Sequence, residues 1–351
     1  MAGLPVQSLA MSVGEQIEAI RGEWGKRLLI LGHHYQRPGV LTHVDAIGDS
    51  LELARLAADA REAERIVFCG VHFMAETADM LTRPGQAVYM PDPTAGCPMA
   101  DMATFDQMAR VWAYLREHGD DWLPVVYVNS TASIKALCGQ CGGSTCTSSN
   151  SAAVFRWVFD QGKRVFFLPD EHLGVNTAHD LGLPEESVMV CESELPDCGL
   201  PADRLAAARV VVWKGYCHVH TKFTVAQITE ARAQMPGAQV IVHPECRRQV
   251  VRAADAHGST AKIVEYVKAA PPGSAVLIGT EMHLVCRLAE THAGHRTVKA
   301  LVLSVCANMA KTNEQNLLRL LQEWPDAHIV RVAPEVAADA RVALQRMLDV
   351  S

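Results

Sequence analysis

Short, uninterrupted apolar runs recur along the chain, and helix-length amphipathic segments separate them. The runs include RLLILG, RIVFCG, AVYMP, LPVVYV, RVFFLP, RVVVWKG, AQVIVHP, SAVLIG and KALVLSV. A strand with one face in water would alternate apolar and polar residues, so continuous apolar runs predict strands that are buried on both faces. Buried strands that alternate with helices form parallel sheets. The pattern therefore predicts an α/β protein that contains short parallel sheets.

The amino-acid composition limits the classes of molecule that the chain is suited to bind. The chain has 351 residues, of which 20% are charged, with a formal net charge of −7. An acidic chain without a run of Lys and Arg is poorly suited to bind nucleic acid or an anionic membrane surface. The apolar run over residues 300–310 is much shorter than the roughly 20 residues of a membrane-spanning helix, and the first residues lack the pattern of a signal peptide. We therefore expect a cytoplasmic protein that binds neither nucleic acid nor membrane.

The elements recur in a fixed order, which indicates three copies of one structural unit. Each unit opens with an apolar strand that ends in polar residues and continues with a helix that begins at a serine. A second strand followed by one histidine comes next, and a third strand ends the unit at a cysteine. The opening strands are LLILGHHYQ, VVYVNS and VIVHPE; the serines are Ser50, Ser148 and Ser259; the histidines are His72, His172 and His283; the cysteines are Cys97, Cys217 and Cys306.

The spacing of matching residues supports this repeat. From the polar end of the first strand to the histidine, counted from His33, Asn129 and His243, the separations are 39, 43 and 40 residues. The middle copy is longer because it holds GQCGGSTC, and a second insertion, CESELPDCGLPADR, precedes its cysteine. We therefore expect three pseudo-symmetric α/β/α units around a central site, over residues 1–105, 106–225 and 226–351, the last with an extra C-terminal strand and helix.

Three of the cysteines occupy the same place in the three units. Cys97, Cys217 and Cys306 each lie at the carboxyl end of a predicted parallel strand, which is the edge where open α/β sheets bind ligands. If the three edges face one another, the three thiolates meet. A structural zinc ion normally takes four ligands, whereas a [4Fe-4S] cluster on three cysteines leaves one iron open as a Lewis acid. The alternative is that three unrelated cysteines happen to end strands.

The remaining cysteines give weaker signals. The chain has 11 cysteines, an odd number, and in a reducing cytosol we expect buried thiols or metal ligands rather than a disulfide framework. Cys138, Cys141 and Cys146 lie close together, but one CxxC pair without a second is a weak zinc motif. They leave open a regulatory disulfide from Cys138 to Cys141 or Cys146.

Motifs along most of the chain identify a family resemblance. They are GHHYQ, GDSLEL, MPDPTAGCPMADM, VYVNSTASIKA, CTSSN, LPDEHLG, WKGYCHVH, VHPEC, GST, GTEMHL and CANM, in this order from about residue 28 to 310. With these motifs the sequence resembles the quinolinate synthase family, iron–sulfur enzymes of NAD biosynthesis. The resemblance implies a three-domain pseudo-symmetric fold and an oxygen-sensitive [4Fe-4S] cluster on Cys97, Cys217 and Cys306. It also implies condensation of iminoaspartate with dihydroxyacetone phosphate to quinolinate, phosphate and two waters.

The resemblance and the strand-end positions together give a set of candidate site residues. Helix N-termini attract anions, and Ser50, Ser148, Ser259 and Thr260 each begin a predicted helix, although plain N-capping would also explain serines there. The substrate-binding set is His33, Ser50, Tyr127, Asn129, Ser148, His243, Glu245, Ser259 and Thr260. Glu245 is the expected general base, with a pKa raised by enclosure, and Tyr35 and Tyr127 are expected to move protons or orient hydroxyls.

Some interpretations stay open or carry less weight. On an extended segment His218 and His220 would share one side while Cys217 points to the other, so we expect neither histidine to matter as much as the strand-end residues. Because iminoaspartate is short-lived, functional coupling to an aspartate oxidase follows from the resemblance. A zinc hydrolase built on His243 and Glu245, or an iron–sulfur sensor without catalysis, are the alternative functions.

Overall fold

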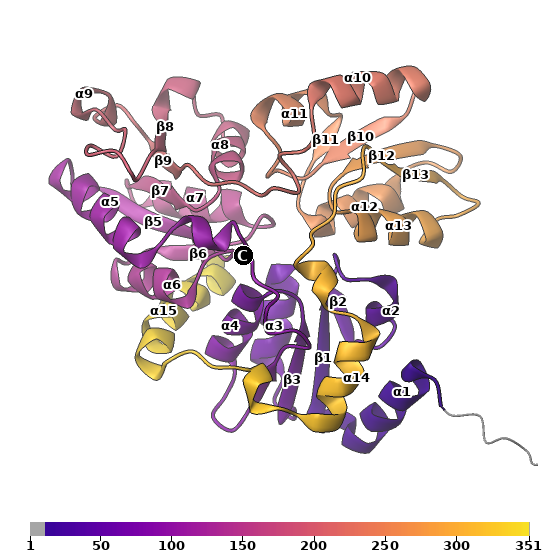
Figure 1. Cartoon of the computed structure of the whole chain (residues 1–351). Helices are drawn as coiled ribbons and strands as arrows, with labels where there is room; N and C mark the ends of the chain where they lie inside the picture. The colour runs from indigo at the N-terminus through magenta and orange to yellow at the C-terminus, as the bar shows by residue number, and fades with distance from the viewer. Residues whose placement is uncertain (1–10, 351) are drawn as a thin grey trace, which may run out of the picture.

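Three sheets of short strands, each flanked by helices, surround the centre of the molecule (Figure 1). The computed structural model of the chain describes residues 11–350 and confirms the α/β class. Every strand pair in the sheets is parallel except the pair of β14 and β4. We use the word unit for each sheet together with its helices.

The first sheet has the strand order β14-β4-β3-β1-β2. Its strands are β1 (Leu28–His33), β2 (Ala46–Gly48), β3 (Arg65–Cys69), β4 (Ala87–Tyr89) and β14 (Ile329–Val330). Its helices are α1 (Val13–Trp24), α2 (Pro38–Leu41), α3 (Ser50–Asp59) and α4 (His72–Leu81).

The second sheet has the order β6-β5-β7-β9-β8. Its strands are β5 (Trp122–Tyr127), β6 (Ser144–Cys146), β7 (Arg164–Leu168), β8 (Val188–Cys191) and β9 (Val210–Trp213). Its helices are α5 (Phe105–Glu117), α6 (Ala132–Gln140), α7 (Ser151–Asp160), α8 (Glu171–Asp180) and the short α9 (Ala202–Leu205).

The third sheet has the order β11-β10-β12-β13. Its strands are β10 (Gln239–Val242), β11 (Ala256–His257), β12 (Ala275–Gly279) and β13 (Thr297–Ala300). Its helices are α10 (Val225–Gln234), α11 (Arg248–Ala253), α12 (Thr260–Ala269) and α13 (Met282–Thr291). The predicted strand KALVLSV is shifted, because β13 begins at Thr297 and leaves the sheet at Ala300.

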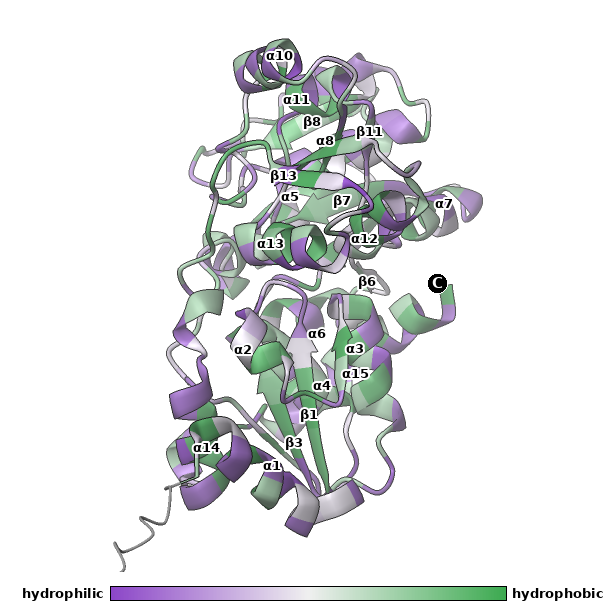
Figure 2. Ribbon diagram, turned by 90° about the vertical axis from the view of Figure 1, so that its right-hand side faces the viewer, coloured by the Kyte–Doolittle hydropathy of each residue, from purple (hydrophilic) through white to green (hydrophobic). Residues whose placement is uncertain are grey.

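Burial explains why the apolar runs became these strands. In β7 every residue after Arg164 is buried, and β9 is buried throughout. Figure 2 shows the strands in the hydrophobic colour inside the units, with purple residues mainly on the outer sides of the helices. Helices such as α13 and α14 (Glu314–Glu323) bury leucines on one face only. Two-sided burial of short strands is the condition that the sequence pattern predicted.

The three sheets share one arrangement. Numbered within each unit, the strands lie in the order second, first, third, fourth. The second sheet adds β8, just before its long insertion, as an outer strand, and the first sheet adds β14 from the C-terminal segment. The ladders pair Gly32 with Cys69, Val126 with Leu168, and Val242 with Gly279. The residues that follow, His33, Tyr127 and His243, are therefore structural equivalents. The predicted alignment of His33 with Asn129 is wrong by two residues.

The C-terminal segment does not stay with the third sheet. Helix α14 packs on α1, β14 pairs antiparallel with β4 of the first sheet, and α15 (Pro334–Val350) packs on α6 and β6 of the second (Figure 1). A Cβ on Gly139 would lie 2.0 Å from the backbone oxygen of Asp339, so α6 and α15 approach each other more closely than a side chain would allow. The tail therefore ties the first two units together.

No helix among residues 11–350 combines the length and the apolar character needed to cross a bilayer.

Candidate functional site

A cavity opens where the strand ends of the three units face one another. Its lining contains twelve residues predicted from the sequence, namely His33, Tyr35, Ser50, Cys97, Tyr127, Asn129, Ser148, Cys217, His243, Glu245, Thr260 and Cys306. Ser259 is the predicted site residue that does not line the cavity, because its side chain caps α12 and accepts from the Lys262 N–H. The structure thus brings residues from all three units to one place.

The predicted residues form equivalent sets in the three units. His33, Tyr127 and His243 follow equivalent ladder positions, and Tyr35, Asn129 and Glu245 lie two residues further along. Ser50, Ser148 and Thr260 form a further equivalent set. In the ladders His33 pairs with Gly48 and Tyr127 pairs with Cys146, and in the third sheet Gly258 follows the residue that pairs with Val242. Ser50, Ser148 and Thr260 each lie two residues after these positions. The cavity is therefore a pseudo-threefold site, and its chemical asymmetry comes from side-chain identity.

The predicted helix start at Ser50 is confirmed, whereas the one at Ser148 is wrong. Ser50 is the first residue of α3, but it is not the N-cap, because Asp49 accepts from the N–H groups of Leu51 and Glu52. Ser148 precedes α7 by three residues, since that helix begins at Ser151. The hydroxyls of Ser50 and Ser148 are thus not used as caps, which leaves them free to face the cavity that both residues line.

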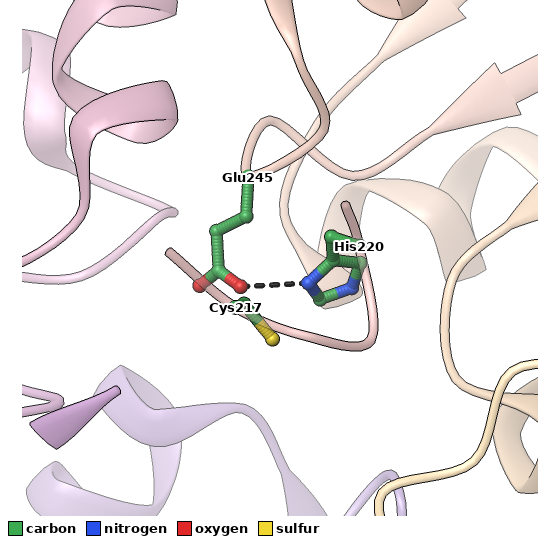
Figure 3. A group of neighbouring side chains, drawn as sticks. All are labelled: Cys217, His220 and Glu245. Carbon is green, nitrogen blue, oxygen red and sulfur yellow. Dashed lines mark hydrogen bonds and ion pairs between the residues drawn. The ribbon is translucent and has the colours of Figure 1, made fainter. Parts of the chain in front are cut away.

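Glu245 is the centre of a buried hydrogen-bond network. Its Oε1 accepts from the Tyr127 hydroxyl at 2.6 Å, and its Oε2 lies 2.6 Å from Nδ1 of His220 (Figure 3). Nε2 of His220 contacts the Thr280 hydroxyl at 3.0 Å, which in turn lies 2.8 Å from the Tyr35 hydroxyl. A continuous path of exchangeable protons therefore runs from Tyr127 through Glu245 and His220 to Tyr35.

The hydrogen-bond network and burial have opposite effects on the pKa of Glu245. Burial alone raises the pKa of Glu245, but the adjacent imidazoles of His220 and His243 and the hydrogen bonds from His220 and Tyr127 outweigh it and leave the pKa below its ordinary value. The expectation that enclosure would raise this pKa is therefore wrong. Burial, followed by the charge of Glu245, raises the pKa of Tyr127 well above its ordinary value. The site holds a carboxylate beside neutral hydroxyls.

Burial keeps the imidazoles of His33 and His243 neutral. It lowers the pKa of His243 to about 3 and places the pKa of His33 well below its ordinary value. His243 stacks on His220 with ring centroids 4.2 Å apart, and its Nδ1 accepts from the Glu245 N–H at 3.3 Å. His33 accepts from the Tyr35 N–H in the same way at 3.1 Å. In both loops the accepting nitrogen is Nδ1, so the proton lies on Nε2.

His220 lies in the cavity, contrary to the expectation for an extended segment. Residues 218–222 form a turn, and the His220 N–H donates to the Cys217 carbonyl at 3.2 Å. The turn returns His220 to the side of Cys217, whereas an extended strand would have separated the two. Both His218 and His220 line the cavity. A turn signal in CHVHT was not recognisable from residue types, because it lacks glycine, proline and asparagine.

The three cysteines that the repeat singled out have the same local structure. The residue two positions before each cysteine accepts a hydrogen bond at its carbonyl oxygen, at 2.8 Å. The donor is the N–H of the first residue of α4, α8 or α13. The bonds run from His72 to Ala95, from Glu171 to Gly215 and from Met282 to Ser304. Each cysteine then opens one helical turn, in which its carbonyl accepts from the N–H four residues on; these donors are Asp101, Thr221 and Ala310. The cysteines are therefore equivalent in structure as well as in sequence order.

The surroundings of the thiols fit a shared metal centre. All three line the one cavity, and the backbone N–H three residues after each cysteine faces its sulfur and lowers its pKa. Burial, the larger effect, raises the pKa of Cys97 to about 12, and Cys306 adds to that shift. Buried thiols near one another stay protonated unless a cation balances them. The N–H groups supply donors to anionic sulfur, so the residues present fit a metal cluster on three thiolates.

A smaller group could also hold a single ion. Ligand atoms of Cys217, His220 and Glu245 all lie within 4.8 Å of one another (Figure 3). Both carboxylate oxygens of Glu245 already have short hydrogen bonds, to Tyr127 and His220. A cation there would have to displace the His220 contact, which favours the interpretation of this group as a proton network.

Comparison with known proteins decides the family. The family model described as Quinolinate synthetase A protein matches residues 15–349. This chain belongs to the quinolinate synthase family. A quinolinate synthase of Geobacillus kaustophilus is 47% identical over 338 residues, covering 95% of this chain and 92% of the relative. A quinolinate synthase of Bacillus cereus is 44% identical over 354 residues, covering 99% and 96%. The chain is therefore an enzyme of the quinolinate synthase family, and the cavity between its three units is the candidate active site.

Proposed function

We propose that this quinolinate synthase condenses iminoaspartate with dihydroxyacetone phosphate, releasing quinolinate, phosphate and two waters. The observation that carries the proposal is the meeting of three equivalent cysteines with a carboxylate–tyrosine–histidine network in one cavity. A condensation of this kind needs a group that polarises a substrate oxygen and a base that removes a proton from carbon. The cavity offers candidates for both.

The proposed ligands of a [4Fe-4S] cluster are Cys97, Cys217 and Cys306. When bound, the cluster would supply one iron without a protein ligand, which can act as a Lewis acid toward a substrate oxygen. Each thiolate is supported by the N–H of its own helical turn. Because each unit provides one of the three cysteines, the proposed cluster site is complete only when all three units have assembled.

Neutral donors would hold the anionic substrates. The lining of the cavity within residues 11–350 includes neither Lys nor Arg, although both substrates are anions. Hydroxyls of Ser50, Ser148 and Thr260, the amide of Asn129 and the imidazoles of His33 and His243 are the available donors. The first residues of α3 and α12 lie at the cavity, so unpaired N–H groups at these helix N-termini favour carboxylate or phosphate.

Glu245 is the proposed general base. Its carboxylate would accept a proton from carbon beside the carbonyl or imine, and the Tyr127 hydroxyl, already hydrogen-bonded to it, would help deliver that proton to a departing hydroxyl as water. Tyr35, hydrogen-bonded to Thr280 and Thr260, would orient a substrate hydroxyl at the other end of the network. The lowered pKa of Glu245 keeps its carboxylate ionised before substrate arrives.

We also propose a cytoplasmic setting and functional coupling to an aspartate oxidase that supplies short-lived iminoaspartate. The 11 cysteines are free thiols in the structure, which suits a reducing compartment.

Anaerobic purification followed by iron, zinc and sulfide analysis and a quinolinate assay tests the proposal. We expect about four irons and four sulfides per chain, as a [4Fe-4S] cluster requires, with quinolinate formed from the two substrates. Stoichiometric zinc with little sulfide would instead support a zinc hydrolase. A cluster without turnover would support the iron–sulfur sensor.

A further inference from the structure

Asn176 crosses from the second unit to the loop that carries Glu245. It lies on α8 and is fully buried, and its Nδ2 donates to the carbonyls of Pro244 at 2.7 Å and Cys246 at 2.9 Å. These two carbonyls are on either side of Glu245 in the chain. The side chain amide thus holds both ends of the peptide segment from which the carboxylate projects.

Arg287 makes the corresponding contact from the third unit to the first. It lies on α13, and its Nη2 donates to Nδ1 of His34 at 2.7 Å. Because a guanidinium can only donate, Nδ1 of His34 is the acceptor and its proton lies on Nε2. Burial and the charge of Arg287 lower the pKa of His34 to about 4, in agreement with a neutral imidazole. His34 is the residue between His33 and Tyr35.

The two contacts are related by the repeat. The N-caps of α4, α8 and α13 are Val71, Asp170 and Glu281, and the residues six positions later are Thr77, Asn176 and Arg287. The loop residues that these helices face, His34, Val128 and Pro244, are also equivalent, since each follows one of His33, Tyr127 and His243. Thr77 and Val128 line one small cavity, which places the third pair together as well. Each unit therefore supports the strand-end loop of the next.

We propose that Asn176 and Arg287 are positioning residues for the reaction, acting through Glu245 and Tyr35 respectively. The proposal rests on the function proposed above and assigns roles to residues outside the cavity lining. A loop fixed at both flanking carbonyls keeps Glu245 within hydrogen-bond distance of Tyr127 and His220. At Thr77 the chain has a hydroxyl that donates to the Phe73 carbonyl of its own helix. The polar link across units is therefore made at the two loops that carry the proposed acid–base groups.

The test compares Asn176→Ala and Asn176→Asp with the control Thr177→Val in the anaerobically loaded enzyme. Thr177 is the buried neighbour of Asn176, and its hydroxyl bonds to Ser151 within the same unit. Asn176→Asp keeps the size of the side chain but removes the N–H donors. We expect both Asn176 variants to keep their iron and sulfide and to lose kcat by about 10- to 100-fold with a smaller change in KM, as misplacement of a reacting group does.

A pH profile separates positioning from a general loss of stability. The titratable groups facing Glu245 include Tyr127 from β5, Cys217 and His220 from the segment after β9, His243 from its own loop, and Asp170 from the start of α8. A displaced Glu245 loses the partners that keep its pKa low, so the acidic limb of kcat moves to higher pH in the Asn176 variants. It should not move in Thr177→Val.

Arg287→Lys and Arg287→Met test the second contact. Lysine keeps the charge but lacks the planar guanidinium, so both variants should lower kcat, Arg287→Met more.

For the Asn176 variants, hydrogen–deuterium exchange of the segment over residues 239–250 provides a readout without turnover, because the Glu245 and Cys246 N–H groups are hydrogen-bonded within this loop. Exchange should rise in the Asn176 variants and stay unchanged in Thr177→Val.

Failure of the proposal and failure of the proposed function look different. If the unmodified enzyme makes no quinolinate, the proposed function is wrong, and the exchange experiment still decides whether Asn176 holds the loop. If the unmodified enzyme is active and a folded, cluster-loaded Asn176→Asp enzyme keeps its kcat, pH profile and exchange rates, the positioning role of Asn176 is refuted. Should Asn176→Ala fail to fold, Asn176→Asp and the Arg287 pair decide between the two outcomes.

Discussion

The Tyr127 hydroxyl donates a 2.6 Å hydrogen bond to Glu245, although the two residues are separated by 118 positions in the chain. One comes from the second unit and the other from the third, and His220 completes the contact from the segment between them. The acid–base chemistry proposed above would therefore depend on how the second and third units dock. The network is complete only when the second and third units are together.

Glu245→Gln should abolish most turnover while leaving the metal centre intact. The amide keeps the shape of the side chain but cannot accept a proton, and loss of a general base typically costs about 10²- to 10⁴-fold in rate. Iron, sulfide and the visible absorption of the purified protein should match those of the unmodified enzyme, because the ligand atoms are sulfurs. A Glu245→Gln enzyme with ordinary kcat would remove Glu245 from the mechanism.

Alanine at any one of Cys97, Cys217 or Cys306 should remove most of the bound iron and sulfide. Loss of an outer-shell partner of a metal already costs about 10- to 100-fold in activity or affinity, so loss of a ligand should cost at least as much. Cys286 is exposed on α13 and provides the matched control. Cys286→Ala should retain the full cluster, and retention by Cys97→Ala would contradict the ligand set.

The stability of the protein should fall as the pH drops from about 6.5 to 4, in part because of His172. Burial, together with the charge of Arg247, lowers the pKa of this histidine from 6.5 to about 4. Above pH 6.5 both the folded and the unfolded forms are neutral there, whereas between the two values only the unfolded chain takes up the proton. The free energy of unfolding should therefore drop by up to about 3 kcal/mol from this group.

Thermal unfolding of His172→Gln at pH 8 and pH 5 measures that contribution. Glutamine does not titrate, so the drop in Tm from pH 8 to pH 5 should be smaller in the variant than in the unmodified protein. An equal drop in both proteins would show that other groups account for the acid sensitivity.

Gly139→Ala should destabilise the protein through the tail. The new Cβ would lie 2.0 Å from the Asp339 carbonyl oxygen, and a backbone atom of α15 cannot move aside without moving the helix. Overpacking of this kind costs about 1–3 kcal/mol or more. Gly22, on α1, has nothing within 4 Å and serves as the control. Gly22→Ala should raise the free energy of unfolding by up to about 1 kcal/mol, and a Gly139→Ala protein of unchanged Tm would contradict the close packing.

The α/β class and the long strands followed from the sequence because uninterrupted apolar runs directly indicate burial on both faces. The short strands β2, β6 and β11 were not predicted, since a strand such as Ser144–Cys146 is too short and polar to form a pattern. They exist because the neighbouring strand offers a free edge. The equivalence of Cys97, Cys217 and Cys306 was accessible because cysteines at strand ends recur with the repeat.

Tertiary contacts account for what the sequence could not predict. The protonation state of Glu245 depends on His220 and Tyr127, which lie far away in sequence and outweigh burial only when they are correctly placed. The place of His220 depends on a turn that no turn-forming residue marks. Asn176 and Arg287 occur within ordinary helical patterns, so their contacts with the neighbouring loops became visible only in the assembled units.

The path of the C-terminal segment has a consequence for biosynthesis. The strand that completes the edge of the first sheet and the helix that clamps the first two units are both made after all three cysteines have been translated. A nascent chain can form its sheets one after another as it leaves the ribosome, but the contacts of β14 and α15 form only after residues 329–350 have emerged. If the proposed cluster bound before that point, it would bind between units that the C-terminal strand and helix do not yet hold together.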